Sequence, residues 1–123
     1  MKILEINIKP IGKPRMTKSD KWKKRECVQK YWDFKDNINK EAVKQNFKLS
    51  NKIQINLYFK PSQSLSIKKQ NELLNKPHQT KPDLDNCIKS LLDCLSNADQ
   101  TIHYIIASKQ YANYDKIVIT NID

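Results

Sequence analysis

The chain has 123 residues, which is enough for one hydrophobic core and too few for two stable domains. Its 23 lysines and arginines exceed its 13 aspartates and glutamates, and the net charge of +10 favours a polyanionic partner such as DNA or RNA. No apolar stretch is long enough to span a bilayer, and three cysteines without C-x-x-C spacing support neither a disulfide framework nor a zinc knuckle. We therefore expect a single cytoplasmic domain over residues 1–123, without membrane association.

The N-terminal third predicts a strand, a basic loop and a long helix. Residues 2–8 alternate apolar and polar side chains, as a half-buried strand does. Residues 9–19 contain prolines and a glycine, which favour a loop. Its basic residues include Lys13, Arg15 and Lys18. Residues 20–47 lack Pro and Gly and repeat apolar side chains at steps of three and four, which predicts an amphipathic helix.

The rest of the chain predicts three more strands and two more helices. Residues 52–59 alternate as a strand, and residues 84–95 gather their apolar side chains in one arc of a helix. The remaining candidates are a short helix near 66–75, a strand around 102–106, a polar turn at 111–115 and a strand around 117–119. The order β-α-β-(α)-α-β-β predicts an α+β fold, a mixed sheet of about four strands flanked by the long N-terminal helix and the helix after Asp-Leu-Asp-Asn.

Two acids, Asp83 and Asp85, stand where the helix over 84–95 begins. By themselves they are best explained structurally, Asp83 as an N-cap and Asp85 as a first-turn acid stabilised by the helix dipole, worth about 1 kcal/mol or less each. If Asp83 precedes the helix, its carboxylate can instead converge with that of Asp85. Converged carboxylates need a cation between them, and oxygen ligands favour Mg²⁺ or Mn²⁺ over zinc. Lys89, on the next turn, can reach either Asp85 or a phosphate.

Residues 81–93, Lys-Pro-Asp-Leu-Asp-Asn-Cys-Ile-Lys-Ser-Leu-Leu-Asp, resemble the metal-binding segment of the RusA-like Holliday junction resolvases, a family common in bacterial prophages. The stretch from Asp99 to Tyr111 and the Lys-Pro-Arg-Met-Thr sequence from Lys13 are similar to further segments of the family. The resemblance implies a homodimer that acts on branched DNA with bound Mg²⁺, which Mn²⁺ can replace. It also implies three metal ligands, Asp83, Asp85 and Asp99, and an essential basic residue, Lys89.

The third ligand, Asp99, departs from the family pattern. Members usually carry Asp-Asp where this chain has Ala98-Asp99, and their connection from the helix is longer. A helix that runs to Leu95 carries the chain about 15 Å away from Asp85. The four residues to Asp99 return at most about 13 to 14 Å, so a compact site requires the helix to end earlier or to tilt. The substitutes are His103 and Asp93, interpreted first as a surface strand residue and a solvated helix residue.

Other candidate side chains are interpreted as follows. His78 is ambiguous between a ligand and a structural residue. Cys87 and Cys94 lie on the apolar face of their helix and are interpreted as small buried hydrophobes without chemistry.

The expected reaction is hydrolysis of DNA phosphodiesters with carboxylate-bound Mg²⁺, in paired symmetric nicks that resolve a Holliday junction. Phosphates of the DNA would be held by basic residues, namely Lys13, Arg15, Lys18, Lys81 and Lys89. Two alternatives remain open: a flap or fork nuclease with the same metal site, and a non-catalytic DNA-binding protein on the same fold.

Overall fold

The computed structural model describes residues 2–14, 26–95 and 99–122, apart from the side chains of Cys27 and Asp99. Its elements are β1 (Ile3–Ile6), α1 (Glu26–Lys44), β2 (Lys52–Phe59), α2 (Ile67–Leu73), α3 (Leu84–Leu95), the 3-10 helix η2 (Asp99–Thr101), β3 (Tyr104–Tyr111) and β4 (Lys116–Asn121). The predicted α+β fold and the order of its helices and strands are confirmed.

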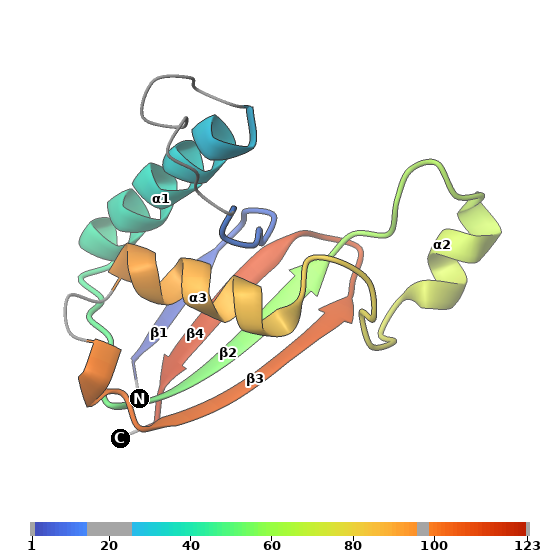
Figure 1. Cartoon of the computed structure of the whole chain (residues 1–123). Helices are drawn as coiled ribbons and strands as arrows, with labels where there is room; N and C mark the ends of the chain where they lie inside the picture. The colour runs from blue at the N-terminus through green and yellow to red at the C-terminus, as the bar shows by residue number, and fades with distance from the viewer. Residues whose placement is uncertain (1, 15–25, 96–98, 123) are drawn as a thin grey trace.

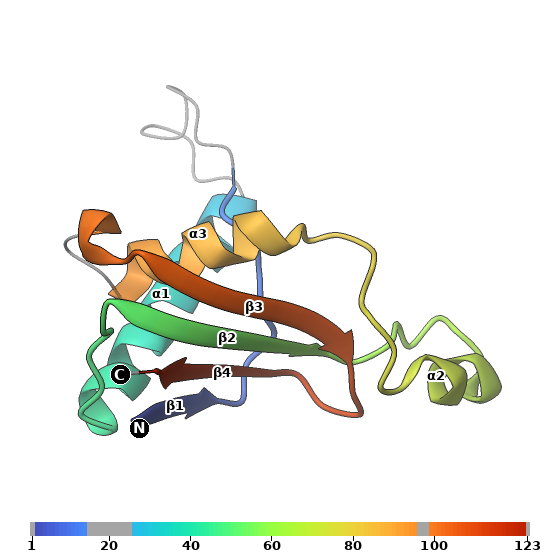
Figure 2. The same ribbon diagram turned by 90° about the horizontal axis from the view of Figure 1, so that it is seen from below.

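The strands form one mixed sheet in the order β1-β4-β2-β3. β4 pairs antiparallel with both β1 and β2, whereas β2 and β3 are parallel. A parallel pair needs a connection that crosses back over the sheet, and here this connection carries α2 and α3. Figures 1 and 2 show α1 and α3 on the same face of the sheet, with α2 standing away from it at one side. The acidic segment therefore lies within the crossover connection.

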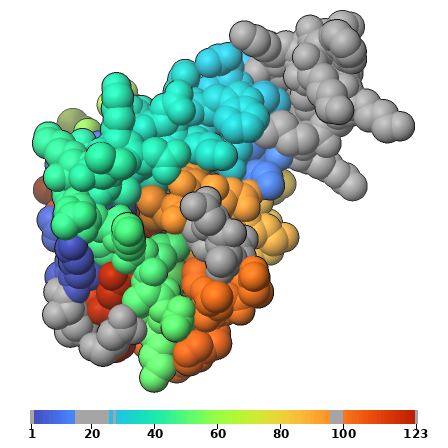
Figure 3. Space-filling view, turned by 90° about the vertical axis from the view of Figure 1, so that its left-hand side faces the viewer, coloured from blue at the N-terminus to red at the C-terminus, as the bar shows by residue number. Residues whose placement is uncertain are grey.

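The core fills the space between this face and the two long helices. Along β2 every second residue is buried, and Ile53, Ile55 and Leu57 are fully buried. Ile38 of α1 and Leu91 of α3 close the same apolar cluster. In the space-filling view, α1 lies directly against α3 (Figure 3). Apolar burial of this kind is the main stabilising term in folding, so the apolar side of α3 fixes which of its edges face outward.

Two elements differ from the sequence prediction at their ends. α1 stops at Lys44, before the predicted end at Phe47, because Asn46 adopts a left-handed backbone with φ 52°. Asn46 N donates to Val43 O at 3.1 Å and Phe47 N to Ala42 O at 2.8 Å, which is the bonding pattern of a Schellman motif. β3 is longer than predicted and starts at Tyr104, beyond Ile102.

The segment after α2 delivers the chain to α3 along the edge of the sheet. α2 is capped by Ser66, whose hydroxyl accepts a hydrogen bond from Lys69 N, and none of the residues of α2 is buried. The chain then pairs with the outer edge of β3: Tyr111 N donates to Lys76 O at 2.9 Å and His78 N to Lys109 O at 3.2 Å.

Among the helices in the described ranges, none is long and apolar enough to cross a membrane.

Candidate functional site

The two acids occupy the boundary that the sequence predicted. Asp83 directly precedes α3, and its carbonyl accepts a hydrogen bond from Cys87 N at 3.0 Å. Asp85 lies in the first turn of the helix. Both side chains are exposed. The backbone N–H groups at a helix start create a positive potential that attracts anionic groups.

A lysine from β3 fixes the segment that leads to these acids. Lys109 Nζ donates to the carbonyl oxygens of Thr80 at 2.6 Å and Pro82 at 2.7 Å. Hydrogen bonds from a charged donor are among the stronger ones in proteins. Lys109 thereby joins β3 to the residues just before Asp83. Sequence reasoning assigned no role to Lys109, and its contacts make it a positioning residue for the start of α3.

One edge of α3 is fastened to the chain that follows β1. Asn86 Nδ2 donates to Lys13 O at 3.1 Å, and the fully buried Ser90 donates through Oγ to Ile11 O at 2.8 Å. Asp93 Oδ2 forms an ion pair with Lys13 Nζ at 2.6 Å. Residues 86, 90 and 93 follow at steps of four and three, which places them on one edge of a helix. Asp93, interpreted from the sequence as a solvated helix residue, is 31% exposed and ion-paired.

Asp93 also affects a neighbouring tyrosine of α1. The pKa of Tyr31 is raised to about 12, mainly because the ring is buried, with the charges of Cys94 and Asp93 and a hydrogen bond to Asp93 adding to this effect. Tyr31 is 2% exposed. Its phenol therefore stays neutral at physiological pH.

Gly12 is the residue that allows this close approach. A Cβ atom at position 12 would lie 2.4 Å from Asn86 Nδ2 and 3.4 Å from Pro82 Cβ. The first distance is far below van der Waals contact, so any other residue would push Asn86 out of its hydrogen bond to Lys13 O. The single glycine of the chain thus sits where the loop meets the start of α3.

Three charged groups at and near the start of α3 make no such contacts. The side chains of Asp83, Asp85 and Lys89 make no hydrogen bond or ion pair with any group in the described ranges. In particular, the ordinary ion pair between Asp85 and Lys89 that the sequence permits is not formed. All three side chains are exposed. They are available to an external metal ion or phosphate.

The third predicted ligand is not placed beside the first two. α3 continues to Leu95, so the early helix end, one of the two conditions under which Asp99 could complete a compact site, does not occur. Figures 1 and 2 show η2 beyond the C-terminal end of α3, opposite the end that Asp83 precedes. The side chain of Asp99 itself is outside the description, and its role as a ligand stays a prediction. Among described side chains, no group of three or more His, Cys, Asp and Glu residues converges.

The remaining candidates have the following positions. Lys81 is exposed just before the acids, and Lys13 is partly exposed but paired with Asp93. Arg15 and Lys18 lie outside the described residues. His103 is exposed beside η2, which agrees with its interpretation as a surface residue. The DNA-binding roles of the basic residues stay predictions.

The buried thiols of α3 agree with their predicted structural role. Cys87 and Cys94 are 1% and 7% exposed, and both are free. Burial raises the pKa of each thiol to about 11. A thiol with such a pKa is almost entirely protonated at neutral pH and is a poor nucleophile and metal ligand.

The fold and the site define a small basic α+β domain that presents unpaired carboxylates and a lysine at the start of a helix. This is the class expected of a protein that binds a phosphate polyanion next to a cation site. The chain matches the endodeoxyribonuclease RusA family over residues 6–120, nearly its whole length, and it belongs to that family. The resemblance found in residues 81–93 is thereby confirmed. No curated protein matches the chain. As a member of this family, the protein is a nuclease, a hydrolase that cleaves DNA.

Proposed function

We propose that the protein is a Mg²⁺-dependent endonuclease that resolves four-way DNA junctions by paired symmetric nicks. The observation that carries the proposal is the division of polar residues on α3. Asn86, Ser90 and Asp93 are each bonded to the loop after β1, whereas Asp83 and Asp85 are exposed and unbonded within the described ranges. Unpaired carboxylates two residues apart at a helix start are suited to binding a group from outside the protein.

The residues present fit a hard divalent cation. Mg²⁺ binds carboxylate oxygens, keeps several waters and commonly uses only one or two protein carboxylates together with substrate phosphates. Asp83 and Asp85 are the residues that would hold it. Asp99 is the predicted third ligand, which this mode of binding does not require. When bound, the cation supplies a polarised water and offsets negative charge on the phosphate being cleaved.

Lys89 is the residue that we assign to the scissile phosphate. It lies four residues after Asp85, so both project from the same helical edge. Its ammonium has no partner in the described part of the chain. A lysine so placed neutralises charge that grows on the phosphate oxygens in the transition state. Lys81, Lys13, Arg15 and Lys18 are proposed to hold neighbouring phosphates, with Lys13 exchanging its ion pair to Asp93 for a phosphate.

We further propose that the active species is a homodimer, because two symmetric nicks need two sites related by a twofold axis. The first half of β3 is the candidate contact. β3 is an edge strand, and Tyr104 and Ile106 on its open face are 48% and 46% exposed. The segment that covers the outer edge of β3 pairs with Lys109 to Tyr111 and, in the described structure, reaches no earlier residue. Sedimentation equilibrium tests this: a monomer at the concentrations that cleave junctions contradicts the dimer.

The experiment that tests the activity is a cleavage assay on matched DNA substrates. A four-way junction, a replication fork, a flap and a linear duplex of the same sequence are incubated with the protein in Mg²⁺ or in EDTA. We expect paired nicks in the junction, in Mg²⁺ alone. Preferential cleavage of the fork or the flap would show that the protein is a fork or flap nuclease and not a junction resolvase. Cleavage that persists in EDTA would contradict the metal requirement.

A second candidate function, DNA binding without cleavage, is favoured by the position of η2. With α3 continuing to Leu95, η2 stands at the opposite end of the helix from Asp83. A site limited to two carboxylates depends on substrate to complete the metal shell. Salt-sensitive junction binding with no nicks at any Mg²⁺ or Mn²⁺ concentration would establish this second function and overturn the first.

A further inference from the structure

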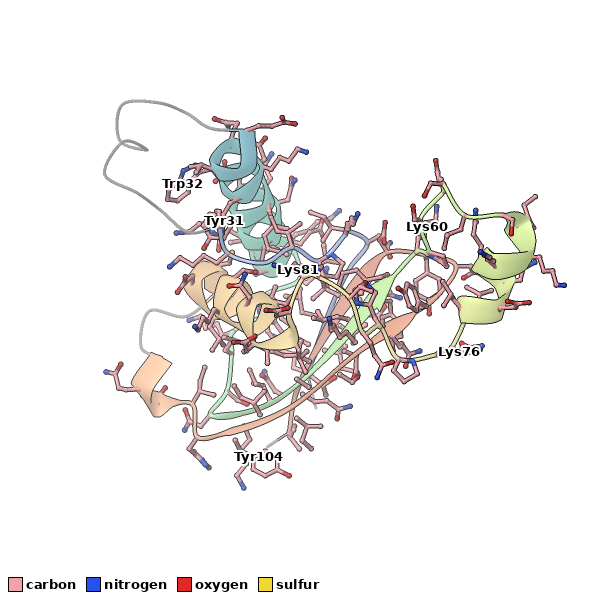
Figure 4. The ribbon with its side chains drawn as sticks, turned by 45° about the vertical axis from the view of Figure 1, so that its right-hand side comes forward. Tyr31, Trp32, Lys60, Lys76, Lys81 and Tyr104 are labelled. Carbon is pink, nitrogen blue, oxygen red and sulfur yellow. The ribbon has the colours of Figure 1, made fainter. Side chains whose placement is uncertain are left out.

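A cavity opens next to the start of α3, and the proposed function does not use it. Its volume is about 460 Å³, and its wall includes Lys9, Phe59, Lys60, His78, Lys81 and Tyr111. These residues come from the chain after β1, the ends of β2 and β3, and the segment between α2 and α3. Figure 4 shows Lys81 beside the start of α3 and Lys60 on the chain that leads toward α2. The volume lies in the range of about 300–1,000 Å³ typical of small-ligand sites.

The charges around the cavity favour an anion. The ammonium groups of Lys9, Lys60 and Lys81 form no ion pair with a described residue. The one carboxylate in the wall, Asp115, accepts a hydrogen bond through Oδ1 from the backbone N of Lys60 at 2.9 Å. Three cations and one anion leave a positive surplus at a concave surface, where such a field is concentrated. A phosphate group is the ligand that this surplus fits.

The other part of the wall is aromatic. The imidazole of His78 stacks on Phe59, with ring centroids 4.0 Å apart, and lies at 4.7 Å from the ring of Tyr111. His78 is 6% exposed, and its Nδ1 is the one buried side-chain polar atom without a hydrogen-bond partner in the described ranges. Buried polar atoms in proteins nearly always have a partner. A flat wall with an unsatisfied ring nitrogen suits a heteroaromatic base.

The charge state of His78 agrees with this assignment. Its pKa is lowered from the ordinary value, first because the ring is buried and then because Lys109 and Lys9 are nearby. The imidazole is therefore neutral at physiological pH. A neutral ring offers one nitrogen as an acceptor and one as a donor, which matches the polar edges of a nucleobase.

The cavity is rigidly connected to the proposed metal site. Pro82 lines the cavity and directly precedes Asp83. The hydrogen bonds from Lys109 Nζ to Thr80 O and Pro82 O hold that shared wall in place. A group bound in the cavity is therefore kept at a fixed position relative to the acids.

We propose that this cavity holds one unstacked nucleotide of the DNA strand being cleaved, with its phosphate among Lys9, Lys60 and Lys81 and its base against Tyr111 and His78. The inference rests on the proposed function, since it assumes that DNA is bound at the start of α3. Duplex DNA is too wide for a cavity of this size, whereas a single nucleotide can enter when it leaves the base stack. Unstacking costs least where pairing is already interrupted, as at a branch point.

The test uses 2-aminopurine, whose fluorescence rises when it leaves the base stack. The nicked position is mapped first, and junctions are then made with one 2-aminopurine at each of the neighbouring nucleotides of the cleaved strand. Binding is measured in EDTA, so that no strand is cut. With the wild-type protein we expect a fluorescence increase at one position, and we expect Lys9→Gln and Lys60→Gln each to reduce or abolish it. Lys68→Gln, an equal charge change at an exposed residue of α2 outside the cavity, should leave it intact.

The outcomes separate this inference from the proposed function. Normal junction cleavage with no fluorescence increase at any position would overturn the nucleotide cavity and leave the nuclease assignment in place. An increase that Lys9→Gln and Lys60→Gln leave unchanged would also overturn it, because the unstacking would then occur elsewhere. A second arm titrates the protein with free 2-aminopurine deoxynucleoside monophosphate: saturable binding there, without a signal in DNA, would assign the cavity to a free nucleotide instead. Absence of junction binding would reject both proposals.

Discussion

The two edges of α3 use the same kinds of polar residue for different purposes. On one edge, Asn86, Ser90 and Asp93 are each bonded to the loop after β1. On the other, Asp83, Asp85 and Lys89 are exposed and have no partner among the described residues. Asp93 and Asp85 carry the same side chain on the same helix, but Asp93 lies two turns further along, where it pairs with Lys13, whereas Asp85 lies in the first turn without such a partner. The contrast teaches that the bonds a carboxylate already makes within the protein indicate whether it is available for chemistry.

The largest expected effect comes from removing the charge of Asp85. Asp85→Asn should reduce junction cleavage by at least about 100-fold, because an amide is a weak Mg²⁺ ligand and the proposed metal site loses one negative charge. The melting temperature should hardly change, since Asp85 has no bond to lose. Asp93→Asn is the matched control on the bonded edge, and it should keep cleavage. Cleavage rates that rank the two variants in the opposite order would reverse the assignment of the edges.

A change at the contact between loop and helix should have the next largest effect. In Gly12→Ala the new methyl group would lie 2.4 Å from Asn86 Nδ2, so the side chain must move and lose its bond to Lys13 O. We expect a loss of about 1–3 kcal/mol in the free energy of unfolding, measured by urea denaturation. An unchanged midpoint would mean that the loop is not held against α3 as described.

Ser90→Ala tests the bonded edge by removing a single hydroxyl group. Ser90 Oγ is fully buried and donates to Ile11 O at 2.8 Å. Its loss leaves that carbonyl without this donor, which costs about 1–2 kcal/mol. Ser108→Ala removes a hydroxyl from the exposed face of β3 and should cost less. Cleavage by Ser90→Ala at temperatures where it is fully folded should match the wild type, and a large drop there would connect the bonded edge to catalysis.

The smallest effect is expected for the ion pair of Lys13 with Asp93. Partly exposed pairs contribute about 0.2–1 kcal/mol, and their contribution decreases as salt screens the charges. A double-mutant cycle with Lys13→Gln and Asp93→Asn measures this interaction directly by thermal or urea unfolding. A coupling energy above this range, or one that salt does not reduce, would show that the pair is more buried and more structural than its exposure indicates.

Local patterns were enough to predict most of the fold. The alternation in residues 52–59 and the apolar arc of residues 84–95 gave the bounds of β2 and α3 as the structure has them, because both patterns depend only on near neighbours. The end of α1 was missed because it depends on the left-handed backbone of Asn46. A left-handed backbone at a single residue hardly alters the hydrophobic periodicity, so the periodicity does not predict it.

The candidate site could be predicted only in part. The position of Asp83 and Asp85 at a helix start follows from local sequence, and so does the burial of Cys87. The bonds from α3 to the loop after β1 could not be predicted. Ser90 and Ile11, for example, are 79 residues apart in sequence, and local patterns carry no information on such a contact. The same reason explains why Lys109 was not recognised as the residue that holds Pro82.

α2 contributes no buried residue, and this has a practical consequence for handling the protein. A peptide inserted at α2 would not disturb the packed interior, and doubling the length of a surface loop costs only about 0.6 kcal/mol in closure entropy. The same connection leads directly to the residues that precede Asp83. α2 is therefore a natural attachment point for a fluorophore or a fused domain.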